Sequence, residues 1–517
     1  MQVTGILKRC LTTNPDGIAT ISDQQSKTWR DTYWDIAKGG AVLRSLGAGA
    51  GDRVAVLALN GTTYFELLFA MPWIGSIIVP LNTRWSLEEL FHAMTDSGSE
   101  ILMADDTFLD QARDLAKRLP GLQLVYIGAE ECPADMIDYR AGVAATDPVP
   151  AHESAEDDLW GILYTGGTTG HPKGVMLSNK NLFVAGLFWL ATCHFTDTTR
   201  YLHVAGFFHI VATMPGIAVT MVGGTHIIES RFDPVPTMQT IEREKPNYAT
   251  FVPTMLSMML NDPEFGKYDL TSMGQCVYGG SPIPDVLIGR MIENLPTWEF
   301  IQGYGQTEST GILTSLPWRA HFGEGSANKR KATGIAVYGA NIAILDPATG
   351  RPVPQGEQGE IAVRGPNVMQ GYWGNPEATQ DTIRDGWLYT GDAAYMDEDG
   401  YLTVVDRIKD MIVTGGENVF SKEVENAVSK CPGVQECAVI GIPDPKWGEK
   451  VHAVVVRRSG HETSEDEIIS FTRELIAGYK CPRSIEFVDA MPMSAAGKVM
   501  KGELRKAFWS DREKRVN

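Results

Sequence analysis

The sequence Tyr164-Thr165-Gly166-Gly167-Thr168-Thr169-Gly170-His171-Pro172-Lys173-Gly174-Val175 follows an apolar run, residues 159–163, that predicts a buried strand. Four of the nine residues from Gly166 to Gly174 are glycine, which permits positive φ and lets the backbone approach a ligand closely. Threonine hydroxyls, successive backbone N–H groups and the lysine can all bind phosphate oxygens. The stretch therefore predicts a phosphate-binding loop. A glycine-rich hairpin turn is an equal alternative for the loop taken alone.

The loop differs from the ordinary nucleotide-binding P-loop. That pattern ends in Gly-Lys-Ser/Thr and leads directly into a helix. Here Lys173 is followed by glycine and by residues of extended character. A phosphotransferase of the kinase type is disfavoured as well, because the Asp and Asn of a kinase catalytic loop are absent. The role of the loop must therefore be decided by other parts of the chain.

Composition narrows the class of protein. A chain of 517 residues is too long for one core and predicts two or three domains. The net charge of −19 argues against nucleic acid as the main partner, while a local basic loop can still bind an anionic substrate. Seven cysteines without a C-x-x-C pair indicate reduced thiols and a cytoplasmic location. We see neither a signal peptide nor an apolar stretch of membrane-spanning length, and the oligomeric state stays open.

The order of expected elements predicts an α/β fold. Strands such as 77–80, 101–104 and 248–251 alternate with helices such as 29–46, 62–74 and 210–221, which implies largely parallel sheets covered on both faces. Residues 130–156 are acidic and rich in proline and alanine, and predict a surface linker. We expect a large N-terminal domain of αβ-layered sheets over residues 1–408, with a small β-barrel subdomain near 333–408. A mobile α+β C-terminal domain over 409–517, about one hundred residues, follows.

Four further segments are too polar and too rich in glycine for a core. Gly303-Tyr304-Gly305-Gln306-Thr307-Glu308 follows an expected strand, where open α/β sheets bind ligands. Tyr389-Thr390-Gly391-Asp392 ends in a carboxylate that could accept bonds from ribose hydroxyls. Residues 406–418 place charged side chains beside a second glycine turn, and residues 493–498 carry one lysine on a loop.

Taken in this order, the five segments resemble those of the adenylate-forming superfamily, which includes acyl-CoA synthetases, luciferases and the adenylation domains of peptide synthetases. The resemblance covers residues 29–504. It implies that the chain activates a carboxylic acid with Mg²⁺ and ATP to an acyl-adenylate, and then transfers the acyl group to the thiol of coenzyme A. This implies ATP, Mg²⁺ and coenzyme A as cofactors or co-substrates.

The resemblance also assigns roles to residues. Lys173 and its loop would hold the β- and γ-phosphates, Thr307 would contact the α-phosphate, and Glu308 would bind Mg²⁺. Lys498 would bridge the carboxylate and the α-phosphate, and Lys409 would be the hinge of the mobile domain. These imply Lys498, Thr307, Glu308 and Lys173 as catalytic residues. The implied nucleotide-binding set is Thr165, Gly166, Gly167, Thr168, Thr169, Gly170, Lys173, Gly280, Ser281, Pro282, Gly303, Tyr304, Gly305, Thr307, Asp392, Arg407 and Lys498.

The acid and the acceptor are less sharply defined. His209 stands where amino-acid-activating relatives carry an aspartate, so an amino acid is disfavoured, although a structural histidine is an alternative. The implied acyl pocket, His209, Val204, Val252, Tyr278 and Gly279, is small and apolar. It suits a fatty acid or an aromatic acid of the hydroxycinnamate or benzoate type. For coenzyme A the implied residues are Gly415, Gly416, Glu417, Trp447 and Lys480; Trp447 has a turn-capping aromatic as its alternative.

Two other functions remain as alternatives. A ligase that loads an acyl group onto a carrier protein would use the same adenylation step and the same pantetheine thiol. A non-catalytic nucleotide-binding homologue would keep the fold alone, but Glu308, Asp392, Arg407 and Lys498 together argue against it. Gly166 departs from the family, because most relatives carry serine there, and we expect retained activity with weaker ATP binding.

Overall fold

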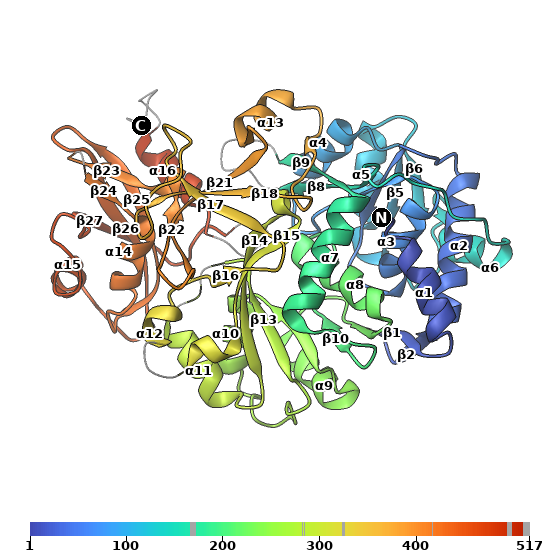
Figure 1. Ribbon diagram of the computed structural model, residues 1–517, viewed down its shortest axis with the longest axis horizontal. Helices are drawn as coiled ribbons and strands as arrows, with labels where there is room; N and C mark the ends of the chain where they lie inside the picture. The colour runs from blue at the N-terminus through green and yellow to red at the C-terminus, as the bar shows by residue number, and fades with distance from the viewer. Residues whose placement is uncertain are drawn as a thin grey trace. The chain divides into compact units, whose positions relative to one another are not determined.

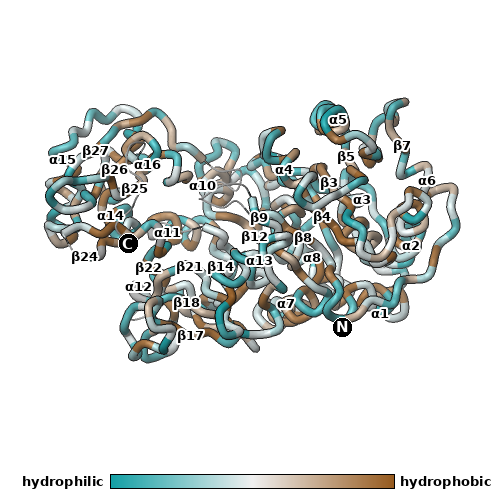
Figure 2. Tube along the Cα trace, turned by 90° about the horizontal axis from the view of Figure 1, so that it is seen from above, coloured by the Kyte–Doolittle hydropathy of each residue, from teal (hydrophilic) through white to brown (hydrophobic). Residues whose placement is uncertain are grey.

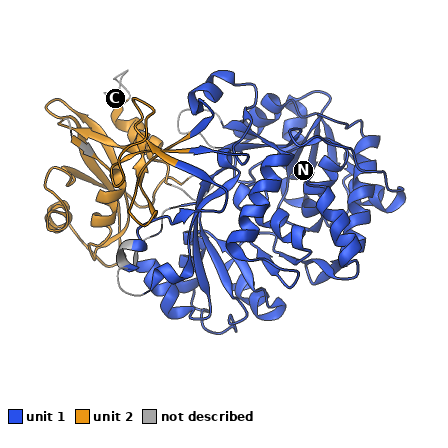
Figure 3. Cartoon of the chain, in the orientation of Figure 1, with its two compact units in different colours: residues 1–342, 363–388 blue, residues 343–362, 389–517 orange. Residues whose placement is uncertain are grey.

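The computed structural model describes residues 1–165, 172–281, 283, 285–322, 326–415, 417–493 and 499–509, without the side chains of residues 285, 327, 328, 409 and 418. Two compact units emerge: residues 1–342 with 363–388, and residues 343–362 with 389–517 (Figure 3). The predicted division at residues 408 and 409, with a hinge there, stays a prediction. Each boundary between the two units along the chain falls within a strand of one small sheet.

The first sheet, in the larger unit, is built from apolar strands that alternate with helices (Figure 1). Its neighbouring strands are parallel except where β8 meets β9 and β9 meets β19, so the expected parallel sheet is confirmed. In order across the sheet the strands are β19 (Gly371–Tyr372), β9 (Lys173–Ser178), β8 (Leu159–Thr165), β4 (Ile77–Pro80), β3 (Arg53–Leu57), β5 (Ile101–Ala104), β6 (Gln123–Tyr126) and β7 (Ile137–Asp138).

Several helices of this region begin at side-chain caps encoded in the sequence. Thr28 and Asp31 form a capping box at the start of α2, and Ser86 and Glu89 form one at the start of α4. Each box provides hydrogen-bond partners for backbone N–H groups that have none within the helix. Figure 2 shows the contrast between the apolar α3 and the largely hydrophilic α5. The helices are α2 (Trp29–Ser45), α3 (Thr62–Trp73), α4 (Leu87–Ser97), α5 (Leu109–Arg118), α6 (Tyr139–Ala145) and α7 (Asn179–Cys193).

The predicted linker over residues 130–156 is wrong for its middle part. Residues 137–145 form β7 and α6, and Tyr139 is buried at 2% exposure. Helix α6 packs against α2, where the side chain of Tyr139 lies over Gly39 and Gly142 faces Val42. The sequence predicted a linker because acidic and proline-rich residues lie on both sides of this short packed segment.

The second sheet, in the same unit, carries most of the predicted ligand-binding loops. Its central strands β10 to β14 run parallel, while β15, β16 and β2 are antiparallel to their neighbours. In order the strands are β16 (Ile335–Ala336), β15 (Gly311–Leu316), β14 (Glu299–Gln306), β13 (Gln275–Gly279), β12 (Tyr248–Phe251), β10 (Arg200–His203), β11 (Thr225–Ile228), β1 (Ile18–Ser22) and β2 (Gln25–Thr28).

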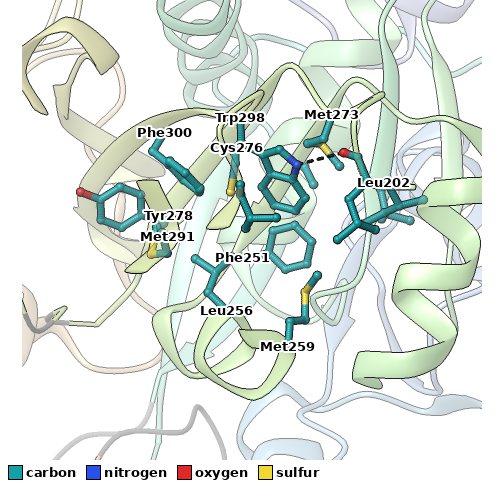
Figure 4. Packing of buried hydrophobic residues seen from close by; sticks show 14 of the residues in the cluster. Leu202, Phe251, Leu256, Met259, Met273, Cys276, Tyr278, Met291, Trp298 and Phe300 are labelled. Atoms are coloured by element: carbon teal, nitrogen blue, oxygen red, sulfur yellow. Dashed lines mark hydrogen bonds between the residues drawn. The ribbon is translucent and has the colours of Figure 1, made fainter. Parts of the chain in front are cut away.

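A core of aromatic and sulfur-containing side chains supports this sheet (Figure 4). Phe251 and Trp298 stack with ring centroids 5.8 Å apart, and the Trp298 indole N–H donates to the carbonyl of Leu270 at 3.0 Å. The associated helices of the region are α1 (Gly5–Thr13), α8 (Ile210–Val222), α9 (Pro234–Glu244), α10 (Pro253–Asn261), α11 (Asp285–Asn294) and α12 (Ser326–Lys329).

Two smaller sheets complete the described chain. The third corresponds to the predicted barrel-like region, and β20, β21 and β22 pair antiparallel there; it contains β17 (Asn341–Leu345), β18 (Gly359–Arg364), β21 (Trp387–Met396), β20 (Ile383–Arg384) and β22 (Leu402–Arg407), with α13 (Pro376–Thr382) before β20. The fourth confirms the predicted α+β character of the C-terminal region; it contains β24 (Glu417–Val419), β23 (Ile412–Thr414), β26 (Gly448–Arg457), β25 (Val434–Asp444) and β27 (Ser484–Phe487), with α14 (Ser421–Val428), α15 (Glu465–Arg473) and α16 (Lys501–Trp509).

Within the described ranges, every helix is too short or too polar to cross a lipid bilayer. All seven cysteines are free, in agreement with the expectation of reduced thiols.

Candidate active site

The carboxyl edge of the second sheet brings together the predicted acyl pocket and part of the predicted nucleotide site. Strands β10, β12, β13 and β14 lie side by side and parallel, so the segments that follow them meet at one edge. Val204 and His209 follow β10, and Val252 follows β12. The remaining predicted residues there are Tyr278, Gly279, Gly280 and Ser281 at the end of β13, and Gly303, Tyr304, Gly305, Thr307 and Glu308 at the end of β14.

Close strand packing explains two of the glycines at this edge. Gly279 pairs with Gly303 across β13 and β14, and a Cβ at position 279 would collide with the Gly303 carbonyl. A Cβ on Gly305 would collide in the same way with the carbonyl of Gly311. The glycine at 279 is therefore required by the sheet itself, whereas Gly280 has φ of 76° and a Cβ there would lie at an ordinary contact distance of 3.7 Å from Cγ1 of Val252.

The loop before His209 is fixed by a residue that the sequence did not single out. The Asn60 side-chain amide donates to the carbonyl of Ala205 at 2.8 Å, and its oxygen accepts from the N–H of Phe207 at 2.8 Å. His209 is half-buried, immediately before the first residue of α8, with its ring 4.4 Å from that of Phe208. Asn60 thus holds the main chain that presents His209, over a sequence separation that leaves no local signal.

The side chain of Tyr278 is fixed by a hydrogen bond to His321. The Nδ1 atom of His321 lies 3.2 Å from the carbonyls of Pro317 and Trp318, so it carries the proton and Nε2 is the acceptor. The hydroxyl of Tyr278 therefore donates to Nε2 at 2.9 Å. Burial lowers the pKa of His321, which agrees with a neutral ring. Tyr278 and Val204 also belong to the aromatic core of the sheet, at 1% and 2% exposure.

The glycine-rich loop connects two paired strands. Thr165 ends β8 and stands opposite Lys173, the first residue of β9, in an antiparallel pair. β8 and β9 are thus adjacent antiparallel strands, as a hairpin requires, and the phosphate-binding role of the residues between them stays a prediction. The predicted loop residues Gly166, Gly167, Thr168, Thr169 and Gly170 lie outside the described residues.

Tyr372 links the lysine of this hairpin to the predicted metal ligand. The ammonium of Lys173 lies 5.0 Å from the centroid of the Tyr372 ring, and the Tyr372 hydroxyl donates to Oε1 of Glu308 at 2.9 Å. Tyr372 is 8% exposed and pairs with Val175 of β9, and the main chain of Met369 donates to the Glu308 carbonyl at 2.9 Å. Sequence reasoning missed Tyr372, because nothing in its own segment marks it as a neighbour of Glu308.

The residues present fit a magnesium ion held mainly by its nucleotide. Glu308, in the short 3-10 helix at Thr307–Ser309, is half-buried and supplies the carboxylate oxygen that Mg²⁺ prefers. The described part of the chain contains no cluster of three or more acidic, histidine or cysteine side chains suited to a metal. One carboxylate, phosphate oxygens and water form the usual ligand set for Mg²⁺ in nucleotide enzymes.

The predicted ribose ligands are brought together in the smaller unit. Asp392 on β21 stands opposite Arg407 on β22, and Oδ1 of the aspartate lies 2.9 Å from Nε of the arginine. The Asp392 side chain is 6% exposed and that of Arg407 is 43% exposed. The N–H of Gly391 donates to Oε1 of Glu360 at 2.9 Å, which fixes the turn before Asp392.

The predicted coenzyme A residues also belong to the smaller unit. The N–H of Gly415 donates to the carbonyl of Trp447 at 2.8 Å. Two cations lie over the Trp447 ring: the guanidinium carbon of Arg483 at 4.8 Å and the ammonium of Lys446 at 4.7 Å. Lys480 is paired with both carboxylate oxygens of Glu423, at 2.7 and 2.8 Å. Glu417 begins β24. Pro282, Gly416, Lys498 and the side chain of Lys409 lie outside the description.

Helix α16, directly after the segment of Lys498, is tied to the carboxylates that flank position 409. Lys501 lies 2.7 Å from Oε1 of Glu425 and donates to the Ser421 hydroxyl, which donates to Asp406 at 2.7 Å. Arg505 lies 2.7 Å from Asp410. Burial alone would lower the pKa of Lys501, but the neighbouring carboxylates outweigh it and raise that pKa.

Comparison with known families agrees with this architecture. The AMP-binding enzyme family matches residues 7–373, and the AMP-binding enzyme C-terminal domain matches residues 423–498. The chain belongs to the AMP-binding enzyme family. The resemblance to the adenylate-forming superfamily is thereby confirmed, and so is the predicted mixed α/β fold.

Individual relatives cover nearly the whole chain. It is 39% identical to feruloyl-CoA synthase from Amycolatopsis sp over 496 residues, 96% of each protein. It is 35% identical to the long-chain-fatty-acid–CoA ligase FadD13 of Mycobacterium tuberculosis, over 90% of each. Among solved structures, ATP-bound MatB from Rhodopseudomonas palustris superimposes with a TM-score of 0.89 at 30% identity, over 99% of this chain and 100% of MatB.

Proposed function

We propose that this chain activates an aromatic acid of the hydroxycinnamate type with ATP and transfers the acyl group to coenzyme A. The reaction class, AMP-forming ligation of an acid to a thiol, is that of its acyl-CoA synthetase relatives and was predicted from the sequence. A carboxylate oxygen attacks the α-phosphorus of ATP and pyrophosphate leaves. The thiolate of coenzyme A then attacks the acyl carbon, and AMP leaves with the oxygen that came from the acid.

One observation carries the choice of acid. The chain is 39% identical to a feruloyl-CoA synthase over 96% of its length, against 35% over 90% for a long-chain-fatty-acid ligase. A fatty acid is the second candidate, supported by the FadD13 likeness.

The larger unit would bind the phosphates. Lys173 places a fixed cation beside Tyr372, and Glu308 is oriented by the same tyrosine, so a cation and a metal-ligating carboxylate are held by one side chain. Bound Mg²⁺ would neutralise charge on the phosphate oxygens. Thr307 would contact the α-phosphate and Tyr304 would stack on adenine.

The smaller unit would supply the ribose and coenzyme A ligands. Asp392 is buried, with its carboxylate oriented by Arg407, as acceptance of ribose hydroxyl bonds requires. Trp447 with its two cations offers a stacking surface and positive charge for the nucleotide end of coenzyme A. Since Lys480 is already neutralised by Glu423, Arg483 is the better phosphate ligand. A carrier protein lacks that nucleotide and is not favoured as the acceptor.

Pyrophosphate release across a panel of acids tests the proposal. Ferulate, 4-coumarate, cinnamate, benzoate, octanoate and palmitate would each be supplied with MgATP, with and without coenzyme A, and the thioesters detected by mass. We expect the hydroxycinnamates to have the highest kcat/KM and to give thioesters. Higher kcat/KM for octanoate or palmitate would make the chain a fatty-acid ligase. If none of the acids supported pyrophosphate release, the catalytic assignment would be overturned.

A further inference from the structure

Helix α4 holds the start of β9 through a histidine. The Nε2 atom of His92 lies 3.2 Å from the carbonyl oxygen of Pro172, the residue directly before Lys173. A carbonyl only accepts, so Nε2 carries the proton and donates it. His92 is half-buried and Pro172 is buried, and the two are 80 residues apart in the sequence. The bond therefore ties the peptide group that precedes Lys173 to a helix remote in the sequence.

The same helix binds the strand that pairs with β9. The hydroxyl of Tyr164 donates to Oδ2 of Asp96 at 2.6 Å, one turn along α4 from His92. Tyr164 stands opposite Gly174, and a Cβ on Gly174 would come within 3.1 Å of Cζ of the tyrosine. Burial and the Asp96 carboxylate raise the pKa of Tyr164, so its hydroxyl stays protonated and can donate. His92 and Asp96 thus hold the two strands where they face each other.

A third contact of α4 reaches the segment of Tyr372. The indole N–H of Trp373, the next residue, donates to the main-chain carbonyl of Asp96 at 3.0 Å. The ammonium of Lys173 lies 5.0 Å from the centroid of the Tyr372 ring. Pro172 precedes one member of this pair and Trp373 follows the other. Helix α4 therefore fixes the main chain beside both members, and all of these residues belong to the larger unit.

We propose that His92 is a positioning residue for Lys173: by holding the Pro172 carbonyl, it sets where the lysine ammonium meets the β- and γ-phosphates of ATP. The inference rests on the proposed function, which gives those phosphates to Lys173, and adds the residue that holds this cation in place. A cation on a fixed main chain loses less conformational freedom when it binds an anion. AMP lacks both phosphates, so AMP binding should not depend on His92.

The test compares His92→Phe with His92→Gln and with a control on the same helix, Thr95→Val. Phenylalanine keeps a ring without an N–H, whereas glutamine carries an N–H donor at the same number of bonds from Cβ as Nε2 of histidine. The exposed Thr95 hydroxyl donates to the carbonyl of Phe91 at 2.8 Å, so Thr95→Val removes a hydrogen bond within α4 only. Dissociation constants of MgATP and AMP would be measured by calorimetry on the full-length proteins without acid. Tm and pyrophosphate release would be measured alongside.

In His92→Phe the dissociation constant of MgATP should rise about fivefold relative to that of AMP. This factor corresponds to about 1 kcal/mol, the net contribution of one hydrogen bond. His92→Gln should return the ratio of the two constants to that of the wild type, and Thr95→Val should leave it unchanged. A merely structural role of His92 would lower Tm and the active fraction of the protein without changing this ratio.

Two results would overturn the inference. One is an unchanged ratio in His92→Phe, and the other is a ratio that rises equally in His92→Phe and His92→Gln, since loss of the ring and not of the donor would then be responsible. Either result leaves the proposed function standing as long as the wild type releases pyrophosphate. Absence of pyrophosphate release with every acid would refute the proposed function, and the binding ratio, measured without acid, would still decide the role of His92.

Discussion

Replacing Tyr372 by phenylalanine isolates a single hydrogen bond in the candidate site. The change removes the donor to Oε1 of Glu308, 2.9 Å away, and leaves the ring that lies beside Lys173. Tyr372 is 8% exposed, so water has little access to replace its hydroxyl. Glu308, the proposed Mg²⁺ ligand, would then lose the hydrogen bond from Tyr372 that orients its carboxylate.

The expected magnitude follows from the charge of the acceptor. A hydrogen bond to an ionised group contributes about 1.5–3 kcal/mol, and the half-buried position of Glu308 favours the lower end. At 1.4 kcal/mol for each factor of ten, kcat/KM for MgATP in the adenylation step should fall about tenfold. Because Glu308 is the proposed Mg²⁺ ligand, the Mg²⁺ concentration needed for half-maximal rate should rise as well.

Initial rates of pyrophosphate release against MgATP and free Mg²⁺ would measure both effects, alongside thiolation of a supplied acyl-adenylate. Tyr126→Phe is the control, since the Tyr126 hydroxyl also bonds a carboxylate, that of Asp106, far across the first sheet. We expect Tyr372→Phe to spare thiolation and Tyr126→Phe to leave both the rate and the Mg²⁺ requirement unchanged. A Tyr372→Phe enzyme within twofold of wild type in both quantities would refute the positioning role.

Two further predictions concern stability. Lys501→Met should lower the free energy of unfolding by about 3–5 kcal/mol in urea, since it leaves the buried carboxylate of Asp406 and the partly buried carboxylate of Glu425 without their cation; a loss below 1 kcal/mol would contradict this. Burial lowers the pKa of His203 to about 3, and the neighbouring His226 is also neutral. As pH falls below about 6.5, these histidines therefore bind protons in the unfolded chain before they do so in the folded protein. Between pH 7 and pH 5 the free energy of unfolding should therefore fall by about 2 kcal/mol per histidine. The free energy of unfolding of His203→Phe should fall correspondingly less, and equal pH dependence in the two proteins would refute the assignment.

Local patterns carried most of the fold. Apolar runs such as 77–80, 101–104 and 248–251 became strands with the expected bounds, because strands buried on both faces read as continuous apolar segments. The N-terminal strand β1 was missed. It joins the second sheet beside β11, with Thr20 opposite His226, and a partner 206 residues away leaves no trace in the local sequence.

The candidate site divides in the same way. The glycine-rich sequence at the ends of two strands predicted the segments at 279–281 and 303–308, and the sheet brings both to one edge. Two side chains that fix other parts of the site could not be predicted, because Asn60 binds Ala205 and Tyr372 binds Glu308 across long sequence separations. The roles given to Lys498 and to the hinge at Lys409 stay predictions.

The fate of the carboxylate oxygen tests the central claim most directly. Ferulate labelled with ¹⁸O in both carboxylate positions would be incubated with MgATP and coenzyme A, and AMP and inorganic phosphate analysed by mass. If the acid forms an acyl-adenylate, one labelled oxygen per thioester formed must appear in AMP. Unlabelled AMP, or label in inorganic phosphate, would show activation by another route and contradict the account.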